Sequence, residues 1–208
     1  MLKIAYDPIY QHPLPEGHRF PMQKYELLPQ QLLHEGTCRP ENFFKPGLPS
    51  DEDILRAHRR DYYENLKQGG LTRREMRKVG FPWSPELVLR ERRIAQGTIQ
   101  GCLFALEFDI AMNIAGGTHH AYSDRGEAFC MLNDQAIGAH FLLDQNLAKR
   151  ILILDLDVHQ GNGTAALAAV SVIGELDADR RPGEGGERYV ETEPPKWSYG
   201  PRPEGTRR

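Results

Sequence analysis

The sequence predicts one α/β domain built on a parallel sheet, and three observations point to it. Short apolar stretches at residues 2–5, 111–117 and 150–155 favour strands, and longer segments of helical period lie between them. Strand, helix and strand at this spacing are typical of parallel βαβ units. The 208 residues also give room for one domain with a substantial core.

The first part of the chain is expected to begin with the buried strand at 2–5 and then to be mostly helical. Apolar spacing predicts a helix over 22–34, with a kink or a division into two shorter helices at Pro29. Ser50 is followed by three acidic residues, and a cap with early carboxylates suits the helix dipole, so we expect a helix over 51–67.

Two further helices have clear start signals. Thr72 and Glu75 have the spacing of a capping box, with Gly80 as the C-terminal stop. A proline directly after Ser84 suits the first helical position and predicts a long helix to about residue 107.

The C-terminal part changes character along its length. Residues 133–146 predict an amphipathic helix, and the run 150–155 predicts a strand buried on both faces. After about residue 174 the chain is rich in Gly, Pro and charge and has no period, so it cannot offset its ordering entropy. We therefore expect an ordered part over 1–167 and a disordered tail over 168–208.

Composition argues against several classes of function. The net charge of -3 gives no basic field for nucleic acid, and the arginine-rich stretch 90–93 is expected to be a solvated helix face. Three scattered cysteines form neither a disulfide framework nor a CxxC pair, so a reducing cytoplasm is the expected location. Neither a signal peptide nor a membrane span is expected from the apolar runs.

Chemistry-bearing residues follow the strand predicted over 150–155. Side chains alternate along a strand, so Asp155, Asp157 and His159 are expected on one side, at a sheet edge where ligands bind. A carboxylate with an imidazole is a partial ligand set for Zn²⁺. Taken alone, the same residues are equally compatible with turn-capping carboxylates and a surface histidine.

Two adjacent histidines, His119 and His120, lie in a glycine-bounded loop after the strand predicted over 111–117. Tandem imidazoles suit proton transfer, because one can take a proton while its neighbour donates another. Each needs a partner that fixes its tautomer, and Asp155 and Asn162 are polar residues that could serve. Incidental loop histidines are the alternative for this motif alone, but its occurrence beside the first motif favours a site.

Three stretches together resemble the histone deacetylase and acetylpolyamine amidohydrolase family, most closely the bacterial members akin to class IV histone deacetylases. They are LPEGHRFPMQKYELL, GGTHHAYSDRGEAFCMLNDQAIGA and RILILDLDVHQGNGT. The resemblance covers residues 1 to about 167, and the last two motifs, in this order, are highly specific. It implies the N-terminal part of a catalytic domain with the three-layer, parallel-sheet arginase/deacetylase-type fold.

The resemblance implies a zinc site and a reaction. Asp157 and His159 match two of the family's three zinc ligands, and His119 and His120 match its tandem acid/base histidines. The implied reaction is hydrolysis of an acetyl amide, on acetyl-lysine in a protein or on a small acetyl amide. Nucleic acid and membrane are not expected partners, and the oligomeric state stays open. Family members often also bind a monovalent cation such as K⁺ near the residues that match Asp155, Asp157 and His159.

Further matches surround these residues. Asp155 matches the acid that partners the first histidine, and Asn162 matches the polar partner of the second. Phe129 matches a wall of the substrate channel, and Ala128 stands where the family commonly has a glycine whose carbonyl contacts substrate. Cys130 is expected to be a small buried filler, since a metal-hydroxide mechanism needs no thiol.

The chain also departs from the family. Arg19 resembles an internal arginine of the fold, with a surface salt bridge as the alternative, and Gln160 replaces a second histidine that is not a ligand. The family continues well past the DxH strand, and that part supplies the third zinc ligand, an aspartate, and a carbonyl-polarising tyrosine. We expect neither role from the later candidates Asp177, Asp179, Tyr189 and Tyr199.

Three hypotheses follow. The first is a zinc-dependent deacetylase by family, active only if the missing parts are supplied. The second is a truncated, catalytically inactive fragment, from a frameshift or a premature end, that lacks the third ligand and the tyrosine. The third is a metal-binding module of unrelated function, which the tandem histidines argue against.

Overall fold

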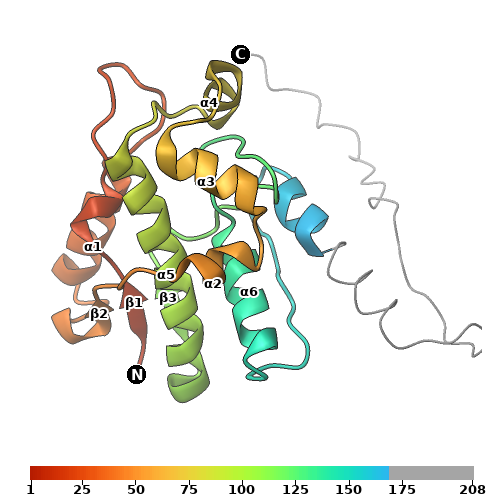
Figure 1. Ribbon diagram of the computed structural model, residues 1–208. Coiled ribbons are helices and arrows are strands. Elements are labelled where there is room, and N and C mark those ends of the chain that lie inside the picture. The colour runs from red at the N-terminus through yellow and green to blue at the C-terminus, as the bar shows by residue number, and fades with distance from the viewer. Residues whose placement is uncertain (169–208) are drawn as a thin grey trace, which may run out of the picture.

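The computed structural model describes residues 1–168, so the tail and the candidates Asp177, Asp179, Tyr189 and Tyr199 lie outside the described range. Strands and helices are mixed along the chain, with four successive α-helices between β2 and β3 (Figure 1). In order they are β1 (Lys3–Ala5), η1 (Pro8–Tyr10), α1 (Lys24–His34), η2 (Pro40–Asn42), β2 (Phe43–Phe44), α2 (Asp51–Leu55), α3 (Arg60–Gln68), α4 (Arg73–Val79), α5 (Pro85–Phe108), β3 (Ala111–Asn113) and α6 (Asp134–Asp144). Residues 162–168 are also helical.

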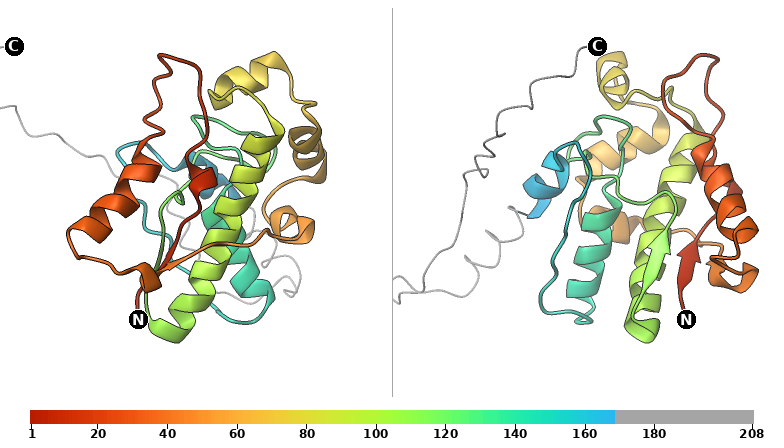
Figure 2. Two further views of the ribbon diagram at one scale, coloured as in Figure 1. Left: turned by 90° about the vertical axis from the view of Figure 1, so that its left-hand side faces the viewer. Right: turned by 180° about the vertical axis from the view of Figure 1, so that it is seen from behind.

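The sheet has three parallel strands in the order β2-β1-β3, and Ile4 of β1 pairs with Phe43 and with Met112. A Cβ placed on Gly97 of α5 would lie 3.1 Å from the Ala5 Cβ, so Ala5 faces α5. Because strand side chains alternate, the fully buried Ile4 faces the opposite side. Figures 1 and 2 show β1 between α1 and α5, which gives the helix–sheet–helix layering predicted from the sequence.

The hydrophobic core lies mainly around α5, between the sheet, α3 and α6. Its fully buried side chains include Tyr10, Ile54, Tyr63, Leu66, Leu87, Ile94, Ile99, Met131, Leu132 and Ile137. Within residues 1–168, no helix has the length and apolarity that crossing a bilayer requires.

Most helix boundaries agree with the start signals of the sequence. The side chains of Ser50, Thr72, Ser84 and Asn133 each accept a backbone N–H from three residues on. The helix predicted over 22–34 is the single helix α1 with Pro29 inside it, so a division into two helices is wrong.

The single helix predicted over 51–67 is also wrong, because the chain breaks between α2 and α3. At the break the Arg59 N–H donates to the Ser123 carbonyl at 2.8 Å rather than to Leu55, four residues back. The neighbouring His58 is buried, with the backbone of Tyr122 and Ser123 in the same loop beside it. A contact with a distant loop therefore outweighs the local preference for a continuous helix.

The arginine-rich stretch of α5 is not the solvated face that the sequence suggested. Arg90 is only 2% exposed, and its Nε donates to the Tyr10 carbonyl at 2.7 Å. Arg92 and Arg93 donate to backbone carbonyls in the loop 45–50. These side chains supply hydrogen bonds to irregular backbone that would otherwise lack partners, and so fasten it to α5.

The strand predicted over 150–155 is not formed. Residues 151–156 pair with no strand among residues 1–168, and Leu152 and Leu154 are 88% and 71% exposed. Figures 1 and 2 show this part of the chain running along α6, on the side away from β3. With α6 between them, the two backbones cannot form a ladder. We call residues 151–158 the apolar segment.

Candidate functional site

The tandem histidines lie in the loop between β3 and α6, and a carboxylate in the first turn of α6 holds that loop. Asp134 accepts the backbone N–H groups of Gly117 and Thr118 at 3.0 and 2.7 Å. It also accepts the hydroxyls of Thr118 and Thr98. Gly117 has a φ of 85°, a left-handed conformation that glycine adopts without strain. The backbone just before His119 is therefore fixed.

His119 is buried and is bound to a carboxylate. Its Nδ1 lies 2.6 Å from Oδ2 of Asp155. A carboxylate accepts, so Nδ1 carries a proton, and in the neutral ring Nε2 then has the lone pair. A Cβ on Gly161 would collide with the same carboxylate oxygen, so only glycine there leaves room for Asp155 to reach His119.

His120 is bound in the same way to an amide. Its Nδ1 lies 3.0 Å from Oδ1 of Asn162, and that atom also accepts the Gly163 N–H at 3.1 Å. The second bond identifies the amide atom as the oxygen, so the His120 Nδ1 is the donor. The His119 and His120 ring centroids lie 4.2 Å apart. Two imidazoles with the same tautomer thus stand side by side.

The two residues matched to zinc ligands bind each other instead of converging with further donors. Oδ1 of Asp157 accepts the His159 N–H at 2.7 Å and lies 2.9 Å from its Nδ1. The pKa of Asp157 is lowered, first by this backbone N–H and then by the imidazole. Their side chains are 50% and 74% exposed, and their alternation on a buried strand is not realised.

A metal has only part of a donor set in the described chain. Within residues 1–168, no three His, Cys, Asp or Glu side chains are grouped so that they could hold an ion. Asp157 and His159 are donors of the kind that zinc accepts, but a protein zinc site usually takes three or four protein ligands. Residues 1–168 therefore fit zinc only in part.

Phe129 stands in an aromatic cluster at the end of α4. Its ring centroid lies 4.9 Å from that of Phe20 and 5.1 Å from that of Phe81. The Arg19 guanidinium lies 5.0 Å from the Phe129 ring centre, a cation–π geometry. Arg19 is exposed and has no ion pair with residues 1–168, so it is neither internal nor salt-bridged there.

The backbone at the cluster is strained. Ala128 and Phe129 have φ values of 46° and 68°, in the left-handed region that disfavours residues with a Cβ. Their N–H groups donate to the carbonyls of Lys78 and Val79 at the end of α4, at 2.9 and 2.6 Å. These two bonds hold the turn in place against the strain.

Cys130 has the environment of a filler. It is buried, and burial raises the pKa of its thiol to about 12, so the nucleophilic thiolate is scarce near neutral pH.

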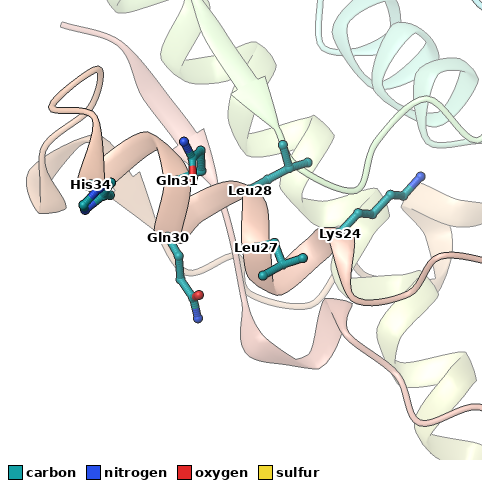
Figure 3. Close-up of a pocket in the computed structure, with 6 residues that line it drawn as sticks. All are labelled: Lys24, Leu27, Leu28, Gln30, Gln31 and His34. Atoms are coloured by element: carbon teal, nitrogen blue, oxygen red, sulfur yellow. The ribbon is translucent and has the colours of Figure 1, made fainter.

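Two surface hollows lie away from the tandem histidines. Figure 3 shows one of them, an open hollow along α1 lined by Lys24, Leu27, Leu28, Gln30, Gln31 and His34. A second lies over the break between α2 and α3, beside His58 and Ser123. Neither includes a residue of the tandem-histidine pair.

Comparison with known proteins gives a consistent assignment. Residues 18–171 match the histone deacetylase domain. An uncharacterised protein of Picosynechococcus sp. is 46% identical over 162 residues, which cover 78% of this chain and 54% of that protein. The acetoin utilization protein AcuC of Staphylococcus aureus is 30% identical over 176 residues, covering 78% of this chain and 45% of AcuC.

A solved structure has the same fold. The crystal structure of a histone deacetylase homologue from Aquifex aeolicus aligns with a TM-score of 0.67 at 24% identity, over 80% of this chain and 47% of that one. The chain thus spans about half the length of the relatives that it matches. With a domain match over most of its length, the chain belongs to the histone deacetylase family.

Proposed function

We propose that this chain carries the acid/base part of a zinc-dependent site that removes acetyl groups from acetyl-lysine or a similar acetyl amide. The observation that supports it most is the pair His119 and His120, with each Nδ1 bound to a separate acceptor. Both Nε2 atoms can then exchange protons with a substrate. Positioned imidazoles of this kind contribute about 10²–10⁴-fold to a reaction.

The two acceptors suit different tasks. The Asp155 carboxylate accepts from Nδ1 of His119 and leaves its Nε2 to take a proton during the reaction. The Asn162 amide fixes the His120 ring without adding charge, which suits a group that exchanges a proton at the leaving nitrogen. Phe129, with Ala128 beside it, would form a wall for the apolar stem of an acetyl-lysine.

Zinc would be held by Asp157 and His159 together with a ligand from outside residues 1–168. When bound, zinc lowers the pKa of a coordinated water towards about 7. The same stretch, with Asp155, is where a monovalent cation such as K⁺ would bind.

The partial donor set supports a second candidate, a fragment without catalytic activity. The chain spans about half the length of its relatives. Deacetylation by the whole domain would also need a third zinc ligand and a group that polarises the substrate carbonyl. Weak binding of zinc without turnover is the expected behaviour of such a fragment, because two protein ligands are fewer than a zinc site usually has.

Hydrolysis of an acetyl-lysine peptide, with and without added Zn²⁺, tests the proposal. The variants are His119→Gln and His120→Gln, with His34→Gln on the exposed side of α1 as the matched control. We expect zinc-dependent turnover that falls by about 10²-fold or more in the first two variants and is unchanged in the control. Turnover that is zinc-independent, or equal in all variants, would remove the proposal. Weak zinc binding without turnover would establish the inactive fragment.

A further inference from the structure

The residues around Asn162 lie directly against the backbone of the tandem-histidine loop. The Thr164 N–H donates to the His119 carbonyl at 3.1 Å. A Cβ on Gly163 would collide with the Ala121 carbonyl and would lie 2.7 Å from the His119 oxygen. Contact this close is open only to glycine, so the two backbones meet with no side chain between them.

One buried side chain ties these two backbones together. Asn133 is fully buried, and its Nδ2 donates to the Ala121 carbonyl at 3.1 Å and to Oγ1 of Thr164 at 2.9 Å. Its Oδ1 accepts the Ala136 N–H at 3.0 Å and so caps α6. A single amide therefore joins the histidine loop, the start of α6 and the helical residues 162–168.

The amide is itself anchored from behind. The backbone N–H of Asn133 donates to Nε2 of the buried His58 at 2.9 Å, so Nε2 is unprotonated. His58 sits in the break between α2 and α3, where Arg59 binds the Ser123 carbonyl. Because α2 ends before His58, Nε2 of His58 is placed to accept the backbone N–H of Asn133.

Asn162 depends on this arrangement for its position. It is part-exposed and reaches His120 through one side-chain hydrogen bond, two residues from Thr164. We propose that Asn133 and Thr164 are positioning residues that form a latch. The latch holds Asn162 against His120 and keeps the His120 proton on Nδ1. The role of the latch in catalysis rests on the proposed function. The latch itself consists of hydrogen bonds within this chain and does not depend on that function.

The test compares Thr164→Val, which keeps the shape and removes Oγ1, with Thr164→Ser, which keeps the hydroxyl. The readout is the ¹⁵N spectrum of the histidine rings of the full chain, without metal, at about pH 8.5, where an ordinary imidazole is neutral. We expect a His120 Nδ1–H signature in the unaltered chain and in Thr164→Ser, and its loss to a mixture of tautomers in Thr164→Val. A folded Thr164→Val chain with the unaltered His120 spectrum would overturn the latch.

A second variant separates the latch from the helix cap. Asn133→Asp keeps an acceptor that can cap α6 but removes both donors of the latch. We expect the same loss of the His120 Nδ1–H signature, with α6 retained in the circular dichroism spectrum; an unaltered signature contradicts the proposal. Should the buried carboxylate prevent folding, the Thr164 pair decides alone. Because this readout uses neither zinc nor substrate, failure of peptide hydrolysis rejects the proposed function and leaves the latch standing.

Discussion

At the scale of single residues, Ala128 shows how one methyl group acts where the backbone turns left-handed. Its φ of 46° lies in the left-handed region, where the Cβ of an L-residue crowds the backbone. This conformation costs roughly 1–2 kcal/mol per residue. The hydrogen bonds to the end of α4 keep the turn formed in spite of that strain.

We therefore predict that Ala128→Gly stabilises the fold by up to about 1 kcal/mol, since relief of strain exceeds the added backbone entropy of glycine. Ala139→Gly, within α6, is the matched control and is expected to destabilise by about 1 kcal/mol. Urea unfolding measures both. Equal losses of unfolding free energy at the two positions would contradict the strain argument.

His58 is expected to make stability depend on pH. Burial lowers its pKa from 6.5 to about 4, and the backbone near Tyr122 and Ser123 offsets this only in part. The fold favours the neutral ring, so the unfolded chain takes the proton first. Stability is then full above pH 6.5 and is lost as pH falls from 6.5 to 4, by about 3 kcal/mol at most.

The variant His58→Gln tests this, because its amide oxygen can accept the Asn133 N–H but does not titrate in that range. We expect a shallower loss of unfolding free energy between pH 6.5 and 4 than in the unaltered chain. Urea unfolding at several pH values measures it. Parallel curves would show that another group is responsible.

Candidate residues were predictable where a short local pattern holds them. His119, His120, Asp155 and Asn162 stand in two compact motifs, and the structure brings them into contact in those pairs, while their catalytic roles and the zinc ligands stay predictions. The residues of the latch were not predictable as part of the site. Asn133 and Thr164 are 31 residues apart in the sequence, and His58 and Asn133 are 75 apart, so no local pattern predicts these contacts.

At the scale of elements, the sequence predicts well what depends on near neighbours. Caps and stops placed α4, α5 and α6 closely, because their ends are set by side chains within the same turn. The break after α2 and the unpaired apolar segment were missed, because each depends on a distant part of the chain. The break follows from a hydrogen bond to Ser123, and the apolar segment has no neighbouring strand among residues 1–168 to pair with.

The apolar segment predicts self-association. Extended, apolar and exposed backbone is a template for pairing with another chain. The double variant Leu152→Lys/Leu154→Lys is expected to lower the fraction of associated chain in light scattering. Its unfolding free energy should change by less than about 0.5 kcal/mol, since both side chains are largely exposed. Leu106→Lys, 56% exposed on α5, is the matched control. Equal association of the unaltered chain, the double variant and the control would show that another surface causes the association.

At the scale of the whole molecule, the fold class and layering follow from the predicted strands and the helices between them.

The partial donor set of residues 1–168 is expected to lower the rate of hydrolysis. We predict that the chain hydrolyses an acetyl-lysine peptide at least about 100-fold more slowly than a family member with a complete donor set, because one transition-state donor alone contributes that much. Matched assays at saturating zinc measure it. Comparable rates would mean that residues after 168 complete the site.

The latch also has a consequence for the order in which the molecule comes into being. Its contacts reach back from Thr164 by 31 residues to Asn133 and by 45 to His119. A chain made from its N-terminus can fold its early parts first. The sheet and α5 are complete by residue 113, yet the groups that orient the imidazoles arrive only with residues 155–164. The nascent polypeptide thus passes through a stage in which its sheet is formed and Asp134 can already hold Gly117 and Thr118. At that stage the rings of His119 and His120 still lack their partners Asp155 and Asn162.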